Sequence, residues 1–85
     1  MYVARCMFEN AYGFSKTYDY KINQKQRLAL KRGDNVIVTR SLPKKGGYAI
    51  AIIESVDVMN PDMANIITEH VCCKIVDEFY TEDEE

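Results

Sequence analysis

The chain has 85 residues, a formal net charge of −2 and a hydrophobic content of 47%. This length corresponds to one small domain, because domains typically need on the order of 100 residues to bury a good core. No stretch approaches the roughly 18 apolar residues of a membrane-spanning helix, and residues 1–5 are not a charged leader before an apolar run. We therefore expect a folded cytoplasmic protein without a membrane segment, and too little chain for a core together with a deep catalytic pocket.

Charge is distributed unevenly along the sequence. Six of the thirteen acidic residues lie within residues 77–85, and the rest of the chain carries a net charge of +4. Residues 16–45 contain nine basic and two acidic residues. A basic middle followed by an acidic end is typical of a protein with charged partners. We predict a single domain over residues 1–77 and a flexible acidic tail over residues 78–85.

The first part of the chain has the period of two that is typical of strands. Apolar residues occupy the even positions of residues 2–8, which predicts a half-buried strand. Residues 10–15 form a predicted loop. Alternation resumes at residues 17–22, where Tyr18 and Tyr20 share one face of the predicted strand with an isoleucine. We therefore expect at least one of these tyrosines to be buried.

The middle of the chain combines a polar segment with a β-branched strand. Residues 23–32 are polar and basic, and we expect Leu28 and Leu30 to point inward from them. Residues 32–34 predict a tight turn in which a glycine adopts a positive φ. Residues 35–40 are rich in Val, Ile and Thr, which predicts a strand.

The remaining segment predicts a hairpin and a closing strand. Residues 42–47 form a predicted hairpin loop, followed by a long strand over residues 48–58. Its alternation breaks near position 53, which predicts a β-bulge. Residues 61–66 follow a turn and predict at most one short helical turn. Residues 70–76 predict the last strand.

These elements predict an all-β fold. Five to six short strands in so few residues are best protected by curling into a small, partly open or closed β-barrel, because this leaves few edges exposed.

The three cysteines indicate free thiols. Cys72 and Cys73 are adjacent, so a strand would point them to opposite faces, where they are poorly placed to bond one another. His70 and Cys72 share a strand face, but the paired spacing of a zinc site is absent. We interpret Cys6, Cys72 and Cys73 as small buried thiols and His70 as a surface imidazole. We predict no catalytic residue, metal site or cofactor.

Several segments resemble known families. Tyr18–Ile22, Leu30–Val38 and Gly47–Ala51 resemble the N-terminal β-barrel domain of the primosomal helicase, which captures the 3′ end of a DNA strand. Those domains usually have Pro where this chain has Thr39. A similar plan in small bacteriophage proteins of unassigned activity extends the resemblance over most of residues 2–77. It includes Glu54–Asp57, Asn60–Asp62 and Lys74–Asp77. The resemblance implies a cytosolic accessory protein of an infected bacterium.

Candidate binding residues combine cations with exposed aromatic rings. The basic residues of segment 16–45 can contact phosphates, and loop aromatics can stack on bases. Equally, the lysines can simply solvate outer strand faces and protect sheet edges. The candidates are Tyr12, Phe14, Arg32, Arg40, Lys44, Lys45 and Tyr48. The candidate contacts of the acidic tail are Glu82, Asp83, Glu84 and Glu85.

Three functions are compatible with these features. The leading hypothesis is a non-catalytic, phage-type accessory protein that engages and modulates a host or phage protein, and that also forms a homodimer or higher oligomer. The second is a barrel that binds nucleic acid, either a single strand or a 3′ end. The third is a protein that binds a small ligand.

Overall fold

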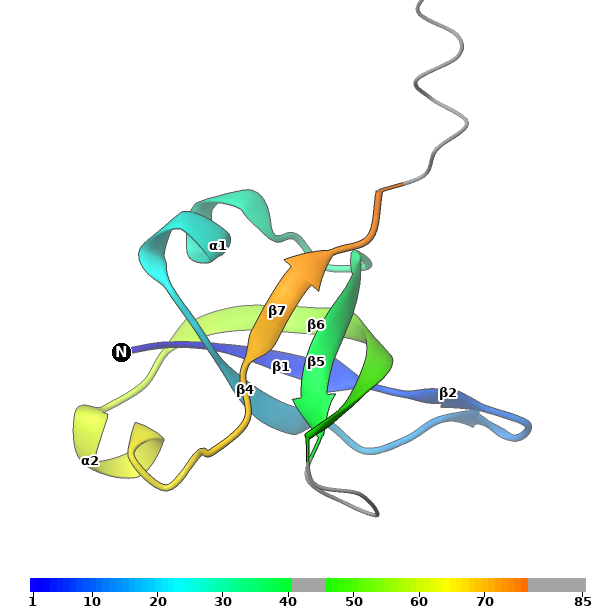
Figure 1. Ribbon diagram of the computed structural model, residues 1–85, viewed down its shortest axis with the longest axis horizontal. Helices are drawn as coiled ribbons and strands as arrows, with labels where there is room; N and C mark the ends of the chain where they lie inside the picture. Colours follow the sequence, from blue (N-terminus) through cyan, green and yellow to red (C-terminus); the bar gives the residue numbers. More distant parts are fainter. Residues whose placement is uncertain (41–45, 77–85) are drawn as a thin grey trace, which may run out of the picture.

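Five strands form one antiparallel sheet that curls toward a barrel (Figure 1). The computed structural model describes residues 1–40 and 46–76. The order of strands across the sheet is β4-β1-β6-β5-β7. Their bounds are β1 Tyr2–Met7, β4 Tyr18–Ile22, β5 Asn35–Arg40, β6 Gly47–Val58 and β7 Val71–Lys74. The predicted all-β fold and its five principal strands are confirmed.

The two outer strands of the sheet approach each other and partly close the barrel. The backbone N–H of Lys21 in β4 donates to the carbonyl of Glu69 at 3.0 Å, and Lys21 forms a parallel bridge with His70 just before β7. On the other side of this segment, the N–H of Thr39 in β5 donates to the His70 carbonyl at 3.0 Å. Proline has no N–H, so the Pro typical of the helicase domains is incompatible with this bond.

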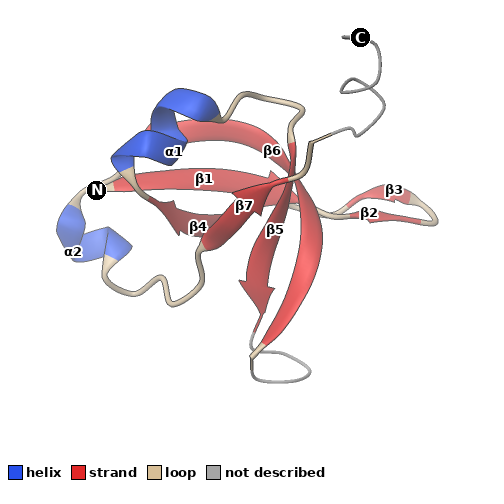
Figure 2. Ribbon diagram, turned by 45° about the horizontal axis from the view of Figure 1, so that its top comes forward, coloured by secondary structure: helices blue, strands red, loops and turns tan. Residues whose placement is uncertain are grey.

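A short helix, α1 (Gln24–Ala29), completes this closure (Figure 2). Its cap is reciprocal: the Gln26 N–H donates to Asn23 Oδ1 at 2.8 Å, and the Asn23 N–H donates to Gln26 Oε1 at 2.9 Å. The same Gln26 side chain donates from Nε2 to the carbonyl of Val71 in β7 at 2.9 Å. One amide therefore caps the helix and binds an edge strand of the sheet.

Helix α1 corrects one sequence prediction. The expectation of at most one helical turn, near residues 61–66, did not include a helix at 24–29. Leu30 is buried as predicted, but Leu28 is 71% exposed. Leu28 lies within α1 on its exposed side, whereas Leu30 follows the helix as its C-cap in extended backbone and is buried in the core.

The smaller elements lie in the predicted loops and turns. Residues 10–15 include the turn of a short hairpin made of β2 (Glu9–Asn10) and β3 (Gly13–Phe14). The predicted helical turn is α2 (Pro61–Ala64), which Asn60 caps through a 2.8 Å bond from the Asp62 N–H. The predicted positive φ of the 32–34 turn is confirmed at Gly33, with φ of 93°. Neither helix is long and apolar enough to cross a membrane, judged over the described residues.

A bulge in β6 decides which side chains reach the core. Arg5 of β1 pairs with Ser55, but the next residue, Cys6, pairs with Ile53, so Glu54 is left without a partner on β1. The predicted bulge is therefore confirmed. It reverses the alternation of β6, because the extra residue shifts each later side chain to the other face. The main core cluster consists of Ala4, Cys6, Tyr20, Ile22, Leu30, Val36, Val38, Ala51, Ile53 and Val71, and Val3 and Ala64 are also fully buried.

We expect Gln26→Ala to lower the free energy of unfolding by about 1–2 kcal/mol, because it removes the reciprocal cap and leaves the Val71 carbonyl without this donor. Urea denaturation measures the change. Gln26→Glu separates the two roles, since a carboxylate still accepts from Asn23 but cannot donate to Val71. Lys25→Ala, one residue away on the exposed surface, is the control and should change stability by less than about 0.5 kcal/mol. A Gln26→Glu variant as stable as the wild type would contradict the role of the Val71 bond.

Candidate partner-binding surface

The predicted site residues do not gather in one place. Arg40 is the last residue of β5, whereas Arg32 lies in the turn before its first residue. A six-residue strand spans roughly 17–20 Å, so these two cations lie at opposite ends of the barrel. The other predicted cations, Lys44 and Lys45, lie outside the described residues, as do Glu82, Asp83, Glu84 and Glu85.

Arg40 lies at one mouth of the barrel. It continues the inward row of β5, after Val36 and Val38, which are both fully buried. A hollow of about 630 Å³ opens here between the end of β5, the start of β4 and β6. We call it the mouth, and it is lined by Phe8, Glu9, Ser15, Tyr18, Tyr20, Arg40, Ala49 and Ile50.

Three aromatic rings form one wall of the mouth. The ring centroid of Phe8 lies 5.9 Å from that of Tyr18 and 6.4 Å from that of Tyr20, in tilted and edge-on arrangements that favour contact between rings. The Lys16 ammonium lies 5.5 Å from the centroid of the Tyr18 ring. Lys16 and Arg40 therefore both lie beside this aromatic wall. Cations next to aromatic rings suit a partner that carries apolar and anionic groups.

A second hollow lies on the other side of Arg40. It has a volume of about 430 Å³ and lies between the end of β5, the start of β6 and residues 68–70. Tyr48, 67% exposed, and His70 contribute to its lining. The Thr39 hydroxyl donates to Glu69 Oε1 at 2.6 Å, which fixes the wall next to β5. Arg40 thus separates two hollows, each with aromatic side chains in its lining.

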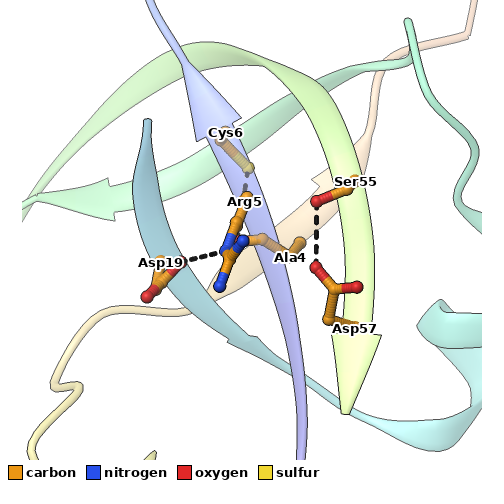
Figure 3. Close-up of polar contacts among 6 residues, drawn as sticks. All are labelled: Ala4, Arg5, Cys6, Asp19, Ser55 and Asp57. Atoms are coloured by element: carbon orange, nitrogen blue, oxygen red, sulfur yellow. Dashed lines mark hydrogen bonds and ion pairs between the residues drawn. The ribbon is translucent and has the colours of Figure 1, made fainter. Parts of the chain in front are cut away.

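The outer surface of the sheet changes character at the bulge. Beyond it, the outer face is polar: Arg5 pairs with Asp19 at 3.4 Å, and the Ser55 hydroxyl donates to Asp57 at 2.9 Å (Figure 3). Before the bulge, the outward side chains of β6 are apolar. Their cross-strand partners Met7 and Ile37 are apolar as well, whereas Asn35 and Thr39 of β5 are the polar exceptions. This outer apolar face consists of Met7, Ile37, Tyr48, Ile50, Ile52 and Cys73. Ile50, which is 63% exposed, also lines the mouth, so the two surfaces are continuous.

The predicted loop aromatics lie on an arm beside the mouth. Tyr12 is fully exposed and Phe14 is 55% exposed, as expected for contact residues. The hairpin that carries them extends away from the sheet in Figure 1. Two hydrogen bonds between Phe8 and Ser15 fix its base. The Phe8 N–H donates to Ser15 Oγ at 3.0 Å, and the Ser15 N–H donates to the Phe8 carbonyl at 2.9 Å. Since Phe8 and Ser15 also line the mouth, the arm begins at that hollow.

The basic segment does not form a single face over the described residues. Lys16 and Arg40 lie near the mouth, and Lys21 lies on β4. Four other cations lie on α1 and the turn that follows it, at the far end of β5. They are Lys25, Arg27, Lys31 and Arg32.

The thiols differ from the prediction. Cys6 is fully buried, as expected, but Cys72 and Cys73 are exposed. They lie on the last strand of the sheet, where the pairing with β5 is irregular, so both side chains reach solvent. His70, predicted at the surface, is exposed, and its Nε2 lies 3.9 Å from Cys72 Sγ. No group of three or more metal-ligating side chains occurs among residues 1–40 and 46–76.

Sequence reasoning considered Tyr18 both as a ring that could stack on bases and as a core residue, but it missed Ile50 and the division of β6 into two halves. The alternation in β6 places Tyr48, Ile50 and Val56 on even positions, as if they shared a face. The predicted bulge carried the missing signal, because even positions before and after it must face opposite sides of the sheet. Ile50 then points outward whereas Val56 packs on the core.

Burial raises the pKa of two groups behind the mouth. The pKa of the Cys6 thiol rises to about 12, chiefly because the buried thiolate would lose its hydration and secondarily because of Asp19. The pKa of Tyr20 also rises to about 12, again mainly through burial, while the Arg40 guanidinium opposes the shift. Burial, and secondarily Cys73, raises the pKa of Cys72. All three groups therefore favour the neutral form more than usual.

We expect the free energy of unfolding to fall as the pH rises above about 9. In the unfolded chain Cys6 and Tyr20 ionise near 9.0 and 10.0, whereas in the folded chain both keep their protons up to about pH 12. The stabilisation is complete below pH 9 and is lost at up to about 1.4 kcal/mol per pH unit for each group. Urea denaturation between about pH 8 and pH 11 measures the slope. Cys6→Ala and Tyr20→Phe should each make it shallower, and an unchanged slope in both would contradict the assignment.

Comparison of the chain with protein-family models, with curated proteins and with solved structures finds no match.

Proposed function

We propose that this chain is a non-catalytic binding module that engages a partner protein at the mouth end of the barrel. The observation that carries the proposal is the exposure of large apolar side chains around Arg40. Tyr18, Tyr48 and Ile50 are 43%, 67% and 63% exposed. Tyrosine and arginine dominate the binding energy of many protein interfaces, because they bury much area and still form hydrogen bonds. We call Tyr18, Arg40, Tyr48 and Ile50 the rim surface.

The partner that fits the rim surface has apolar side chains next to carboxylates. Apolar groups would cover Ile50 and the exposed tyrosines, and carboxylates would face Arg40 and Lys16. The resemblance to small phage proteins favours a protein of a bacterial host or of the phage, which the module would modulate by occupying one of its surfaces. The arm that carries Tyr12 and Phe14 adds a second contact beside the mouth.

The chemistry of the described residues supports a role without catalysis. No polar or charged residue of residues 1–40 and 46–76 is buried. The three groups with shifted pKa values are all shifted upward, which makes a thiolate or phenolate nucleophile rarer. An activated nucleophile needs the opposite shift, and the pKa of Cys72 is raised although His70 Nε2 lies 3.9 Å from its Sγ.

Nucleic acid is the weaker candidate for the same surface. A barrel that binds single strands combines stacking rings with a continuous basic groove that follows the backbone. The mouth offers rings, but Lys25, Lys31 and Arg32 lie at the other end, and Glu9 lies in the lining. This arrangement favours the protein partner, with nucleic acid as the alternative that the experiment must distinguish.

We expect Ile50→Glu to abolish capture of the partner from a nuclease-treated bacterial lysate, because it places a charge in the apolar contact. Leu28→Glu is the matched control. It makes the same kind of change at a side chain that is 71% exposed on α1, away from the mouth. The proposal requires one protein species that the wild type and Leu28→Glu both retain and Ile50→Glu loses. Capture that is equal for both variants would overturn it.

Two further measurements separate the other readings. If anisotropy shows binding of an oligothymidine that weakens steeply with salt and is lost in Arg40→Glu, the mouth binds nucleic acid instead. If analytical ultracentrifugation shows a dimer that Ile50→Glu dissociates and Leu28→Glu does not, a second copy of the chain is the occupant.

A further inference from the structure

The end of the barrel opposite the mouth carries an exposed basic surface. Lys25 lies on α1, and Lys31 and Arg32 lie in the turn that leads to β5; all three are exposed. Within the ranges 1–40 and 46–76, none of these three side chains forms an ion pair with an acidic residue. Asp34, the acid of the same turn, pairs with Lys74 at 3.4 Å. We call Lys25, Lys31 and Arg32 the α1-end basic surface.

The chain leaves the sheet at this same end. β7 runs antiparallel to β5, so Lys74 pairs with Val36 near the start of β5. The N–H of Ile75 then donates to the carbonyl of Asn35 at 2.8 Å. In Figure 1, the end of β7, the start of β5 and α1 all lie at the top of the molecule. The last described residue, Val76, therefore lies close to the turn that carries Lys31 and Arg32.

The residues that follow have the complementary charge. Residues 77–85 contain six acidic and no basic residues, with Phe79 and Tyr80 between Glu78 and Glu82. Nine residues can reach up to roughly 30 Å, and the six-residue helix α1 is only about 9 Å long. The segment is therefore long enough to reach any part of the α1-end basic surface.

A groove between α1 and β7 connects the basic surface with the point where the chain leaves the sheet. It has a volume of about 220 Å³. Lys25 and Lys74 lie on its two walls, and Leu30 lies in its largely apolar lining. Apolar lining between lysines suits a segment in which two adjacent aromatic residues are flanked by acids, because rings and carboxylates are then satisfied together.

We propose that residues 77–85 bind the α1-end basic surface and the α1–β7 groove of their own chain. In this arrangement the acidic segment is an intramolecular competitor for polyanions. It shields Lys25, Lys31 and Arg32 from nucleic acid and from acidic proteins, and leaves the mouth at the other end accessible. The inference concerns a different surface from the proposed function and does not depend on it.

Zero-length carbodiimide cross-linking of the full chain followed by mass spectrometry tests the contact. We expect monomeric species in which carboxylates of residues 77–85 are joined to Lys25 or Lys31, with few cross-links to Lys16 beside the mouth. About 1 M salt should reduce them, because screening weakens contacts between exposed charges. Cross-links that favour Lys16, or that occur only in dimers, would overturn the proposal.

A binding measurement tests the competition. We expect neutralisation of the segment by E82Q, D83N, E84Q and E85Q to strengthen binding of an oligothymidine at low salt by about tenfold. These substitutions keep the length of the chain and lie beyond the last described strand, so the fold should not change. Adding K25E, K31E and R32E should reverse the gain, whereas adding K16E should not. Unchanged affinity in the neutralised chain, or a gain that K16E reverses, would overturn the proposal.

Discussion

The structure depends on closing a sheet of only five strands. In a domain of this size every unpaired edge exposes backbone donors and acceptors to other chains, so the gap between β4 and β7 must be controlled. Three bonds do this around one short segment: Lys21 to Glu69, Thr39 to His70, and Gln26 to Val71. Each comes from a different element. Three different elements, β4, α1 and β5, therefore hold residues 69–71, and Arg40, next to Thr39, lies at the mouth.

The second determining feature is the bulge at Glu54. A regular β6 would place Tyr48, Ile50 and Val56 on one face, and either the core would lose Val56 or the rim would lose Ile50. One extra residue removes this conflict, because the even positions of β6 face outward before it and toward the core after it. The outward side chains of β6 are consequently apolar before the bulge, whereas the polar residues Arg5, Asp19, Ser55 and Asp57 lie on the outer face beyond it (Figure 3).

Periodicity was sufficient to predict the strands, because alternation records burial directly. It failed at α1, since residues 23–32 showed only two inward leucines in a polar segment. The decisive signal was Asn23 followed by Gln26, a capping box. It also failed for Cys72 and Cys73. Their exposure follows from an irregular pairing of β7 with β5, and irregularities of register come from tertiary contacts that local sequence does not record. Arg32 precedes β5 and Arg40 ends it, so the length of this strand places the two cations at opposite ends of the barrel.

The placement of charge then gives the two ends of the barrel different roles. Cations near the mouth lie among rings and apolar side chains, where desolvation strengthens each ion pair and shape selects the partner. Cations at the α1 end lie in solvent, where attraction is long-ranged and unselective. A basic surface of the second kind attracts any polyanion, including nucleic acid. An acidic segment that begins beside that surface competes with such ligands at high effective concentration, and it competes less at the mouth because β5 separates the two ends. Binding by the barrel would then be selective because its unselective end is already occupied.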